Sequence, residues 1–225
     1  MLSNDVQLRR DAQANLDRVL AAAAEVFAAQ GLDATLADVA RHAGVGVGTV
    51  YRRFANKDDL IHDVYADRVH ATESLAEKAS KATDVWAGFV SFFEQSILEL
   101  ATDRGLRQLT TGGYTESLGW SRGTPPTRLA ELLEHNHKTM GVHLIRLVRR
   151  AKRAGVLRKD FQASDMMVLS LSVQAAIDFG GAERPNLYRR ALGFILDGLR
   201  PSHDAPTPLP APALTDAELL RMRRR

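Results

Sequence analysis

The sequence predicts an all-α fold, in which a small N-terminal helical domain is linked to a larger helical one. Apolar residues recur at helical spacing along most of the 225 residues, and no stretch alternates as a strand would. Gly and Pro interrupt this pattern at short intervals near the N-terminus and at longer intervals afterwards. Five prolines between residues 201 and 212 indicate a tail outside the packed core. We assign residues 11–70 to the first domain, 71–200 to the second and 201–225 to the tail.

The composition excludes several classes of protein. Cysteine is absent, so disulfide bonds and thiolate metal sites are excluded. The first thirty residues hold no apolar block like that of a signal peptide, and no apolar stretch is long enough to span a membrane. We therefore expect a cytoplasmic protein with no membrane partner.

The sequence also gives no sign of an enzyme. No Gly-rich phosphate loop follows a strand, and no nucleophile elbow is present. His135, His137 and His143 resemble a metal cluster by composition, but residues 135 and 137 point about 200° apart on a helix. We therefore expect no catalytic residue, no metal and no cofactor.

Four helices joined by short turns are predicted in about the first 75 residues. The first has its apolar stripe over residues 16–27 and ends at Gly31. Thr35, with Asp38 three residues later, begins a short second helix through a capping box. Gly44 ends that helix, a third follows over residues 47–54, and Asn56 caps a fourth.

Residues 35–54 have the properties of a helix-turn-helix. Gly44 can adopt the left-handed conformation that a tight turn between two short helices requires. With Val50 placed inward at 100° per residue, Phe54 also points inward, and the opposite face can enter a DNA major groove. An ordinary solvated helix would more often carry Glu and Lys on that face. Here the face carries Gly48, Thr49, Tyr51, Arg52 and Arg53.

The basic charge of this segment is local. Residues 1–80 carry 9 basic and 12 acidic side chains, so net charge gives DNA binding no support. From Gly44 to Lys57, however, there are three basic residues and no acidic one. A basic tip of this kind is what attraction to phosphates requires. Arg52 and Arg53 can donate to guanine edges or to phosphates, and Gly48 lets the backbone approach DNA closely.

The run from Thr35 to Phe54, TLADVARHAGVGVGTVYRRF, is followed by ANKDDL and resembles the N-terminal domain of the TetR family of transcriptional regulators. The resemblance covers about residues 11–70. It implies a homodimer that binds a palindromic operator in double-stranded DNA, usually as a repressor, and is released by a small-molecule effector. It also implies which residues contact DNA. Phosphates would be held by Thr35, Tyr51 and Lys57, and bases would be faced by Val47, Gly48, Thr49, Arg52 and Arg53.

Five or six further helices are expected up to about residue 200, an architecture similar to the ligand and dimer domain of that family. Asp84 begins the first of them, and a Gly-rich interval over residues 110–126 reads as a short helix followed by a mobile loop. Pro126 suits the first turn of a long helix that ends near Gly155. The last two helices are expected over residues 165–179 and 186–200, the second opened by Pro185.

Large apolar side chains in this domain are candidates for an effector pocket, with ordinary core packing as the alternative. The pocket candidates are Trp86, Phe89, Phe93, Tyr114, Trp120, Met140 and Met166. The last two helices could pair with their copies as a four-helix dimer seam. The seam candidates are Met167, Leu171, Ala175, Leu192, Ile195 and Leu199.

Two alternatives to a ligand-controlled repressor remain open. The chain could be a DNA-binding activator or architectural protein without a ligand, or a helical interaction protein whose helix-turn-helix has lost DNA. A basic stripe at residues 146, 149, 150 and 153 either binds an anionic ligand or is a solvated face at a helix C-terminus.

Overall fold

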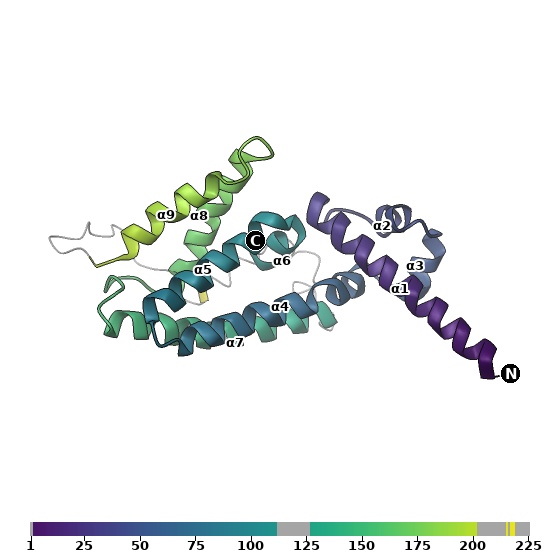
Figure 1. The fold of residues 1–225 in the computed structure, drawn as a ribbon, viewed down its shortest axis with the longest axis horizontal. Coiled ribbons are helices and arrows are strands. Elements are labelled where there is room, and N and C mark those ends of the chain that lie inside the picture. The colour runs from purple at the N-terminus through teal and green to yellow at the C-terminus, as the bar shows by residue number, and fades with distance from the viewer. Residues whose placement is uncertain (1, 112–126, 202–214, 216, 219–225) are drawn as a thin grey trace.

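The computed structural model describes residues 2–111, 127–201, 215 and 217–218, and over these residues the chain is helical with no strand. The predicted all-α fold is therefore confirmed. Figure 1 shows the N-terminal helices at one end of an elongated molecule and the other helices in a larger body. The helices are α1 (Leu2–Gln30), α2 (Leu36–Ala43), α3 (Val47–Arg53), α4 (Lys57–Lys81), α5 (Val85–Thr102), α6 (Arg104–Thr111), α7 (Arg128–Arg153), α8 (Asp165–Gly180) and α9 (Leu187–Leu199).

The head of the molecule consists of α1, α2, α3 and the start of α4 around one apolar core. Gly44 ends α2 in the left-handed conformation, with φ 67° and ψ 32°, as the sequence predicts. A helix as short as α3 is not stable alone, because too few hydrogen bonds follow its nucleation. Val50 and Phe54 hold α3 in place by their burial in this core, which contributes about 1.5–3 kcal/mol for each side chain.

The larger body consists of α4 to α9 around a second apolar core. In Figure 1, α4 and α7 lie side by side, and α8 and α9 form a second pair. The 25-residue helix α4 runs without a break through residue 70, where the sequence analysis placed the domain boundary. It carries Tyr65 into the first core and Ala76 into the second. The two parts of the chain are therefore joined by a shared helix and not by a loop.

Three helices begin at residues that the sequence analysis did not predict. α1 begins at Leu2, because residues 2–15 contain no Gly or Pro that would stop a helix before the apolar stripe starts. α7 begins at Arg128 and not at Pro126, since the Thr127 hydroxyl accepts the Ala130 N–H at 3.1 Å. α9 begins at Leu187, two residues after Pro185.

Helix α6 was not predicted as a separate element. Asp103 lies between α5 and α6 and caps both helices. Its N–H donates to the Glu99 carbonyl at the end of α5, and its carboxylate accepts the Leu106 N–H of α6 at 2.8 Å. The apolar pattern continues across this residue, and a single aspartate within such a pattern does not clearly predict the end of a helix. α6 packs on α1, so this missed helix connects the body to the head.

Arg150 anchors the end of α4 to α7. Its guanidinium donates to the Ser80 carbonyl at 2.5 Å and to the Ala82 carbonyl at 2.7 Å. These are carbonyls of the last turn of α4 and the residue after it, which lack partners within the helix. One member of the basic stripe is therefore a structural contact, whereas Arg146, Arg149 and Arg153 are exposed.

Replacing Arg150 by Ala is expected to lower the free energy of unfolding by about 2–3 kcal/mol, because two charge-assisted hydrogen bonds are lost. Arg149 is the matched control, since it is exposed on the same turn of α7. The Arg149→Ala change should alter stability by less than about 0.5 kcal/mol. Urea unfolding followed by circular dichroism measures both, and equal stability of the two variants would contradict the anchoring role.

Candidate DNA interface and ligand cavity

The outward face of α3 carries the side chains that the sequence assigned to DNA. Val50 is fully buried, which turns the opposite side of the helix to solvent. Tyr51 is 57% exposed and Val47 42% exposed. Of the other predicted base-facing residues, Gly48, Arg52 and Arg53 are exposed and Thr49 is half-buried. The structure therefore brings these residues together on one accessible surface.

Two contacts hold the arginines of this surface. Arg52 donates from Nη2 to the Thr49 hydroxyl at 3.2 Å, one turn earlier in α3. The Arg53 guanidinium lies over the Phe54 ring, 5.5 Å from its centroid. Both side chains are thus oriented along the helix while their remaining donors stay accessible. A Cβ atom built on Gly48 would meet no atom within 4 Å, so the surface beside these arginines is open.

Thr35 and Lys57, the predicted phosphate contacts outside α3, also stabilise the head itself. The Thr35 hydroxyl donates to the Asp38 carboxylate at 2.6 Å, and the Asp38 N–H donates to the Thr35 hydroxyl at 3.1 Å. The Thr35 N–H also donates to this carboxylate, at 2.9 Å, and the two hydrogen bonds that the carboxylate accepts from Thr35 hold the pKa of Asp38 below its usual value. The Lys57 ammonium donates to the Leu32 carbonyl, and burial lowers the pKa of Lys57. Lys57 therefore lies against the turn after α1.

The larger body contains a cavity of about 490 Å³ between α4, α5, α6, α7 and α8. Of the predicted pocket residues, Phe93, Met140 and Met166 line it. Phe89 does not, because its side chain is fully buried in the second core between Trp86, Phe93 and Phe161. Tyr114 and Trp120 lie outside the described residues.

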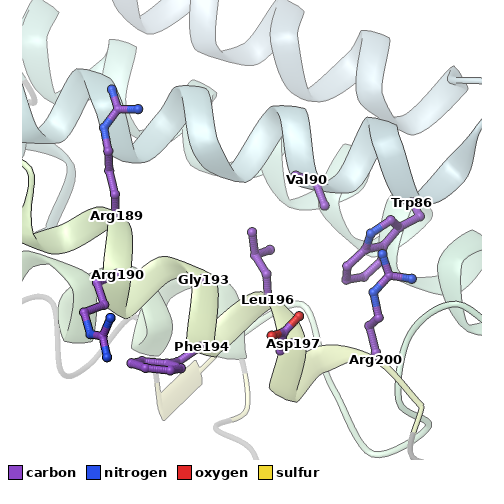
Figure 2. A pocket seen from close by; sticks show the side chains of 9 residues that line it. All are labelled: Trp86, Val90, Arg189, Arg190, Gly193, Phe194, Leu196, Asp197 and Arg200. Atoms are coloured by element: carbon purple, nitrogen blue, oxygen red, sulfur yellow. The ribbon is translucent and has the colours of Figure 1, made fainter.

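Trp86, predicted for the same pocket, lines a different groove between α5 and α9. Figure 2 shows Trp86 and Val90 on α5 facing α9, with Arg200 beside the indole. The Arg200 guanidinium lies over the indole ring, 4.4 Å from its centroid. Figure 2 also shows Arg190 beside the Phe194 ring. The Arg190 guanidinium lies 5.1 Å from the centroid of that ring. The indole is half-buried, and Arg200 covers one of its faces. This groove is separate from the cavity.

Polar side chains in the cavity were missed by the sequence analysis. Ser96 and Glu99 line it from α5, and Thr72 lines it from α4. Their spacing was a usable signal, since Phe92, Ser96 and Glu99 follow the i, i+4, i+7 spacing of one buried helix face. Polar residues inside such a stripe mark a position where the core is interrupted. Aromatic side chains alone do not mark these polar positions.

The predicted seam residues divide into three groups by burial. Leu192 and Leu199 are buried in the core of their own chain, so a surface role for them is wrong in this fold. Met167 and Ile195 are half-buried, whereas Leu171 and Ala175 are exposed. An apolar stripe on α8 instead consists of Val168, Leu171, Ala175 and Phe179, of which Phe179 is 86% exposed. Phe194 on α9 is also exposed.

Asp103 connects the body to the head through buried polar contacts. Its carboxylate accepts the Tyr65 hydroxyl at 2.9 Å and pairs with the Arg68 guanidinium. Burial, together with the charge of Asp103, raises the pKa of Tyr65, so the phenol stays protonated and donates. A Cβ on Gly105 would lie 2.3 Å from the Tyr65 hydroxyl and 3.0 Å from the Phe27 carbonyl. α1, α4 and α6 therefore meet here in close contact.

Two negative findings apply to the described part of the chain. None of its helices combines the length and the apolar character needed to cross a membrane. No group of three or more His, Cys, Asp or Glu residues among these positions could hold a metal ion.

A short helix with an exposed Gly, Tyr and Arg face, set on a small helical head and joined to a body with an apolar cavity, defines a helix-turn-helix regulator. Comparison with protein families identifies which kind. Residues 19–64 match the family described as bacterial regulatory proteins, tetR family. Residues 84–201, about half of the chain, match the transcriptional regulator SbtR-like C-terminal domain. The chain belongs to the TetR family of transcriptional regulators.

Individual relatives agree with this assignment. The HTH-type transcriptional regulator SrpR of Pseudomonas putida is 45% identical over 64 residues, which are 28% of this chain and 30% of SrpR. The match therefore spans less than a third of that relative. The TetR transcriptional regulator SCO0520 of Streptomyces coelicolor has a similar structure, with a TM-score of 0.55 and 26% identity, covering 83% of this chain and 98% of that one.

A third relative shares the fold alone. FadR of Bacillus subtilis, solved in complex with stearoyl-CoA, has a TM-score of 0.54 at 16% identity, and the match covers 82% of this chain and 100% of FadR.

Proposed function

We propose that this protein is a cytoplasmic, non-enzymatic transcriptional repressor that binds a specific operator through α3 and releases it when a small molecule enters the cavity of the body. The observation that carries the proposal is the exposed face of α3, held from behind by Val50 and Phe54. The sequence match of residues 19–64 to the family supports it.

On this proposal, the two kinds of DNA contact divide between different parts of the head. Arg52 and Thr49, already joined by a hydrogen bond, face the base edges, where an arginine reads guanine best. Thr35 and Lys57 lie at the N-termini of α2 and α4, where exposed backbone N–H groups and the helix dipole favour phosphate. Phosphate contacts fix the position of the head, and the base contacts select the sequence.

Two copies of the chain would form the DNA-binding unit, with α8 and α9 as the seam. The stripe of Val168, Leu171, Ala175 and Phe179 on α8 leaves large apolar side chains in water. Phe194 adds another from α9. Exposed apolar side chains grouped on two adjacent helices are typical of an interface between subunits. Two heads on one dimer would read two half-sites of a palindrome.

Helix α6 is suited to transmit ligand binding to the head. Leu106 and Thr110 of this helix line the cavity, and Leu106 and Leu109 belong to the core of the head. Gln108 accepts the Leu32 N–H at 2.6 Å and so holds the turn that leads into α2. A ligand that displaces α6 would therefore move the head. It changes operator affinity only if it binds the two arrangements with different affinity.

The cavity has a size that suits a small effector with an apolar body. The stearoyl-CoA complex of FadR supports a ligand role for the body, since that protein has the same fold. Because FadR is only 16% identical to this chain, the likeness supports the same fold and does not identify the ligand.

The proposal is tested by selecting genomic DNA fragments on the purified dimer and sequencing them. We expect a palindromic site to be enriched. The Arg52→Ala variant should then lose about 1–3 kcal/mol of discrimination at one base pair of each half-site. Arg68→Ala is not a suitable control, because that residue pairs with Asp103. Arg149→Ala is suitable, since it is an exposed arginine on α7. Recovery of unrelated fragments without a common site would contradict sequence-specific regulation.

A further inference from the structure

The part of the cavity wall that α5 contributes carries a negative charge, at Glu99. Glu99 is the acidic residue that lines the described part of the cavity, and the basic residues there are His137 and Lys138, both on α7. Lys138 pairs with Glu134 at 2.8 Å, and its side chain is 70% exposed, so its charge is balanced at the surface. Glu99 is half-buried and lies among apolar residues. The interior of the described wall is therefore negative at Glu99.

Glu99 has a neutral neighbour where a cation would be expected. Two contacts join α4 and α5 one turn apart: Arg68 pairs with Asp103, and the Thr72 hydroxyl lies 3.2 Å from the Glu99 carboxylate. This hydroxyl shares its single proton between Glu99 and the Arg68 carbonyl, which is nearer at 2.9 Å. The guanidinium of Arg68 is thus committed to Asp103. Among the described contacts, Glu99 receives this one hydrogen bond and no positive charge. A half-buried carboxylate balanced only by a hydroxyl attracts a cationic partner.

Ser96 provides a second polar group on the same helix face. Its hydroxyl oxygen is buried and has no hydrogen-bond partner among the residues that the structure describes. Buried hydroxyl groups are normally paired, and an unpaired one calls for an explanation. Ser96 lies one turn before Glu99 on α5, and both line the cavity. A bound group with several N–H donors could pair with both.

The remaining wall is mostly apolar, and its polar residues are Thr110, Asn136, His137, Ser164 and Ser170. The apolar part includes Phe92, Phe93, Met140, Leu144, Ile145 and Met166. Such a wall accepts an alkyl or aromatic body, and flexible Met side chains adapt to its shape.

We propose that the effector is an amphipathic amine, a protonated primary or secondary amino group on an apolar body, with the ammonium placed against Glu99 and Ser96. A carboxylate on the ligand would instead be repelled by Glu99. This proposal rests on the proposed effector role of the cavity and specifies the class of ligand.

The test compares three ligands of equal chain length on the full-length protein by isothermal titration calorimetry, without DNA. We expect decylammonium to bind more tightly than decanol, and decanoate to bind least. In Glu99→Gln the affinity for decylammonium should fall about tenfold or more, because the ammonium then meets a neutral amide in place of a carboxylate, while the affinity for decanol stays the same. Glu94→Gln is the matched control, since Glu94 is exposed on the same helix.

Ser96→Ala provides a second variant in case Glu99→Gln does not fold. It should weaken decylammonium severalfold and leave decanol unchanged. The proposal is overturned if decanoate binds at least as tightly as decylammonium, or if both variants bind decylammonium as the unmodified protein does. Because these titrations contain no DNA, they fail separately from the proposed function, which fails in the operator selection.

Discussion

Replacing Gly48 by Glu is expected to abolish specific DNA binding while the folded protein becomes slightly more stable. A Cβ at this position meets no atom within 4 Å, so the free protein has room for the side chain. Gly inside a helix is destabilising by about 0.5–1 kcal/mol relative to Ala, so Gly48→Ala should raise the free energy of unfolding by that amount. In the complex, however, the carboxylate of Gly48→Glu would lie against DNA, where repulsion lowers the affinity about a hundredfold or more.

The opposite signs of the two effects make this variant informative. Thermal unfolding and fluorescence anisotropy with a labelled operator measure them separately. Ala71→Glu is the control, because Ala71 is exposed in the middle of α4 and gains the same charge away from α3. If Gly48→Glu folds and binds the operator as tightly as Ala71→Glu does, α3 is not the DNA-binding surface.

A large loss of folding stability is expected when Asp103 is replaced by Ala. Replacing it by Ala leaves the buried Tyr65 hydroxyl and the Leu106 N–H without their acceptor, and it leaves Arg68 without its partner. Removing one member of such a buried network costs about 3–5 kcal/mol of folding stability. Because Asp103 joins α5, α6 and the head, we also expect weaker protection of α6 amides in hydrogen exchange.

Two variants calibrate this measurement. Tyr65→Phe removes one hydrogen bond of the same network and should cost about 1 kcal/mol. Asp160→Ala removes a surface ion pair with Arg158 and should cost less than about 1 kcal/mol. Urea unfolding of the three variants is expected to rank Asp103→Ala as the least stable. A loss at Asp103 as small as that at Asp160 would show that the network does not hold the two parts together.

The head could be predicted in detail because its signals are local. Gly44, Val50 and Phe54 have their roles fixed by turn conformation and helical periodicity, and the structure places all three as expected. The outward face of α3 follows from the same geometry. The N-terminal extent of α1 did not follow, since residues 2–15 carry no apolar stripe that would mark a helix.

The body could be predicted only in outline, because its signals are not local. Trp86 and Phe93 are both aromatic and lie on the same helix, yet Trp86 lines the groove and Phe93 lines the cavity. This difference depends on how α9 packs against α5. Leu192 was assigned to a dimer seam, but the second core of its own chain buries it. Periodicity shows which face of a helix is apolar, and it does not show whether that face meets the same chain or a second copy.

The central claim is that the protein recognises a specific DNA sequence through a basic helix face, and a salt titration tests it most directly. Affinity for the selected operator and for a scrambled duplex is measured by anisotropy at increasing salt concentration. We expect the operator to bind about a thousandfold more tightly or better at physiological salt. The logarithm of both affinities should fall linearly with the logarithm of the salt concentration, as phosphate contacts require. Equal affinity for the two duplexes, with no dependence on salt, would contradict the claim.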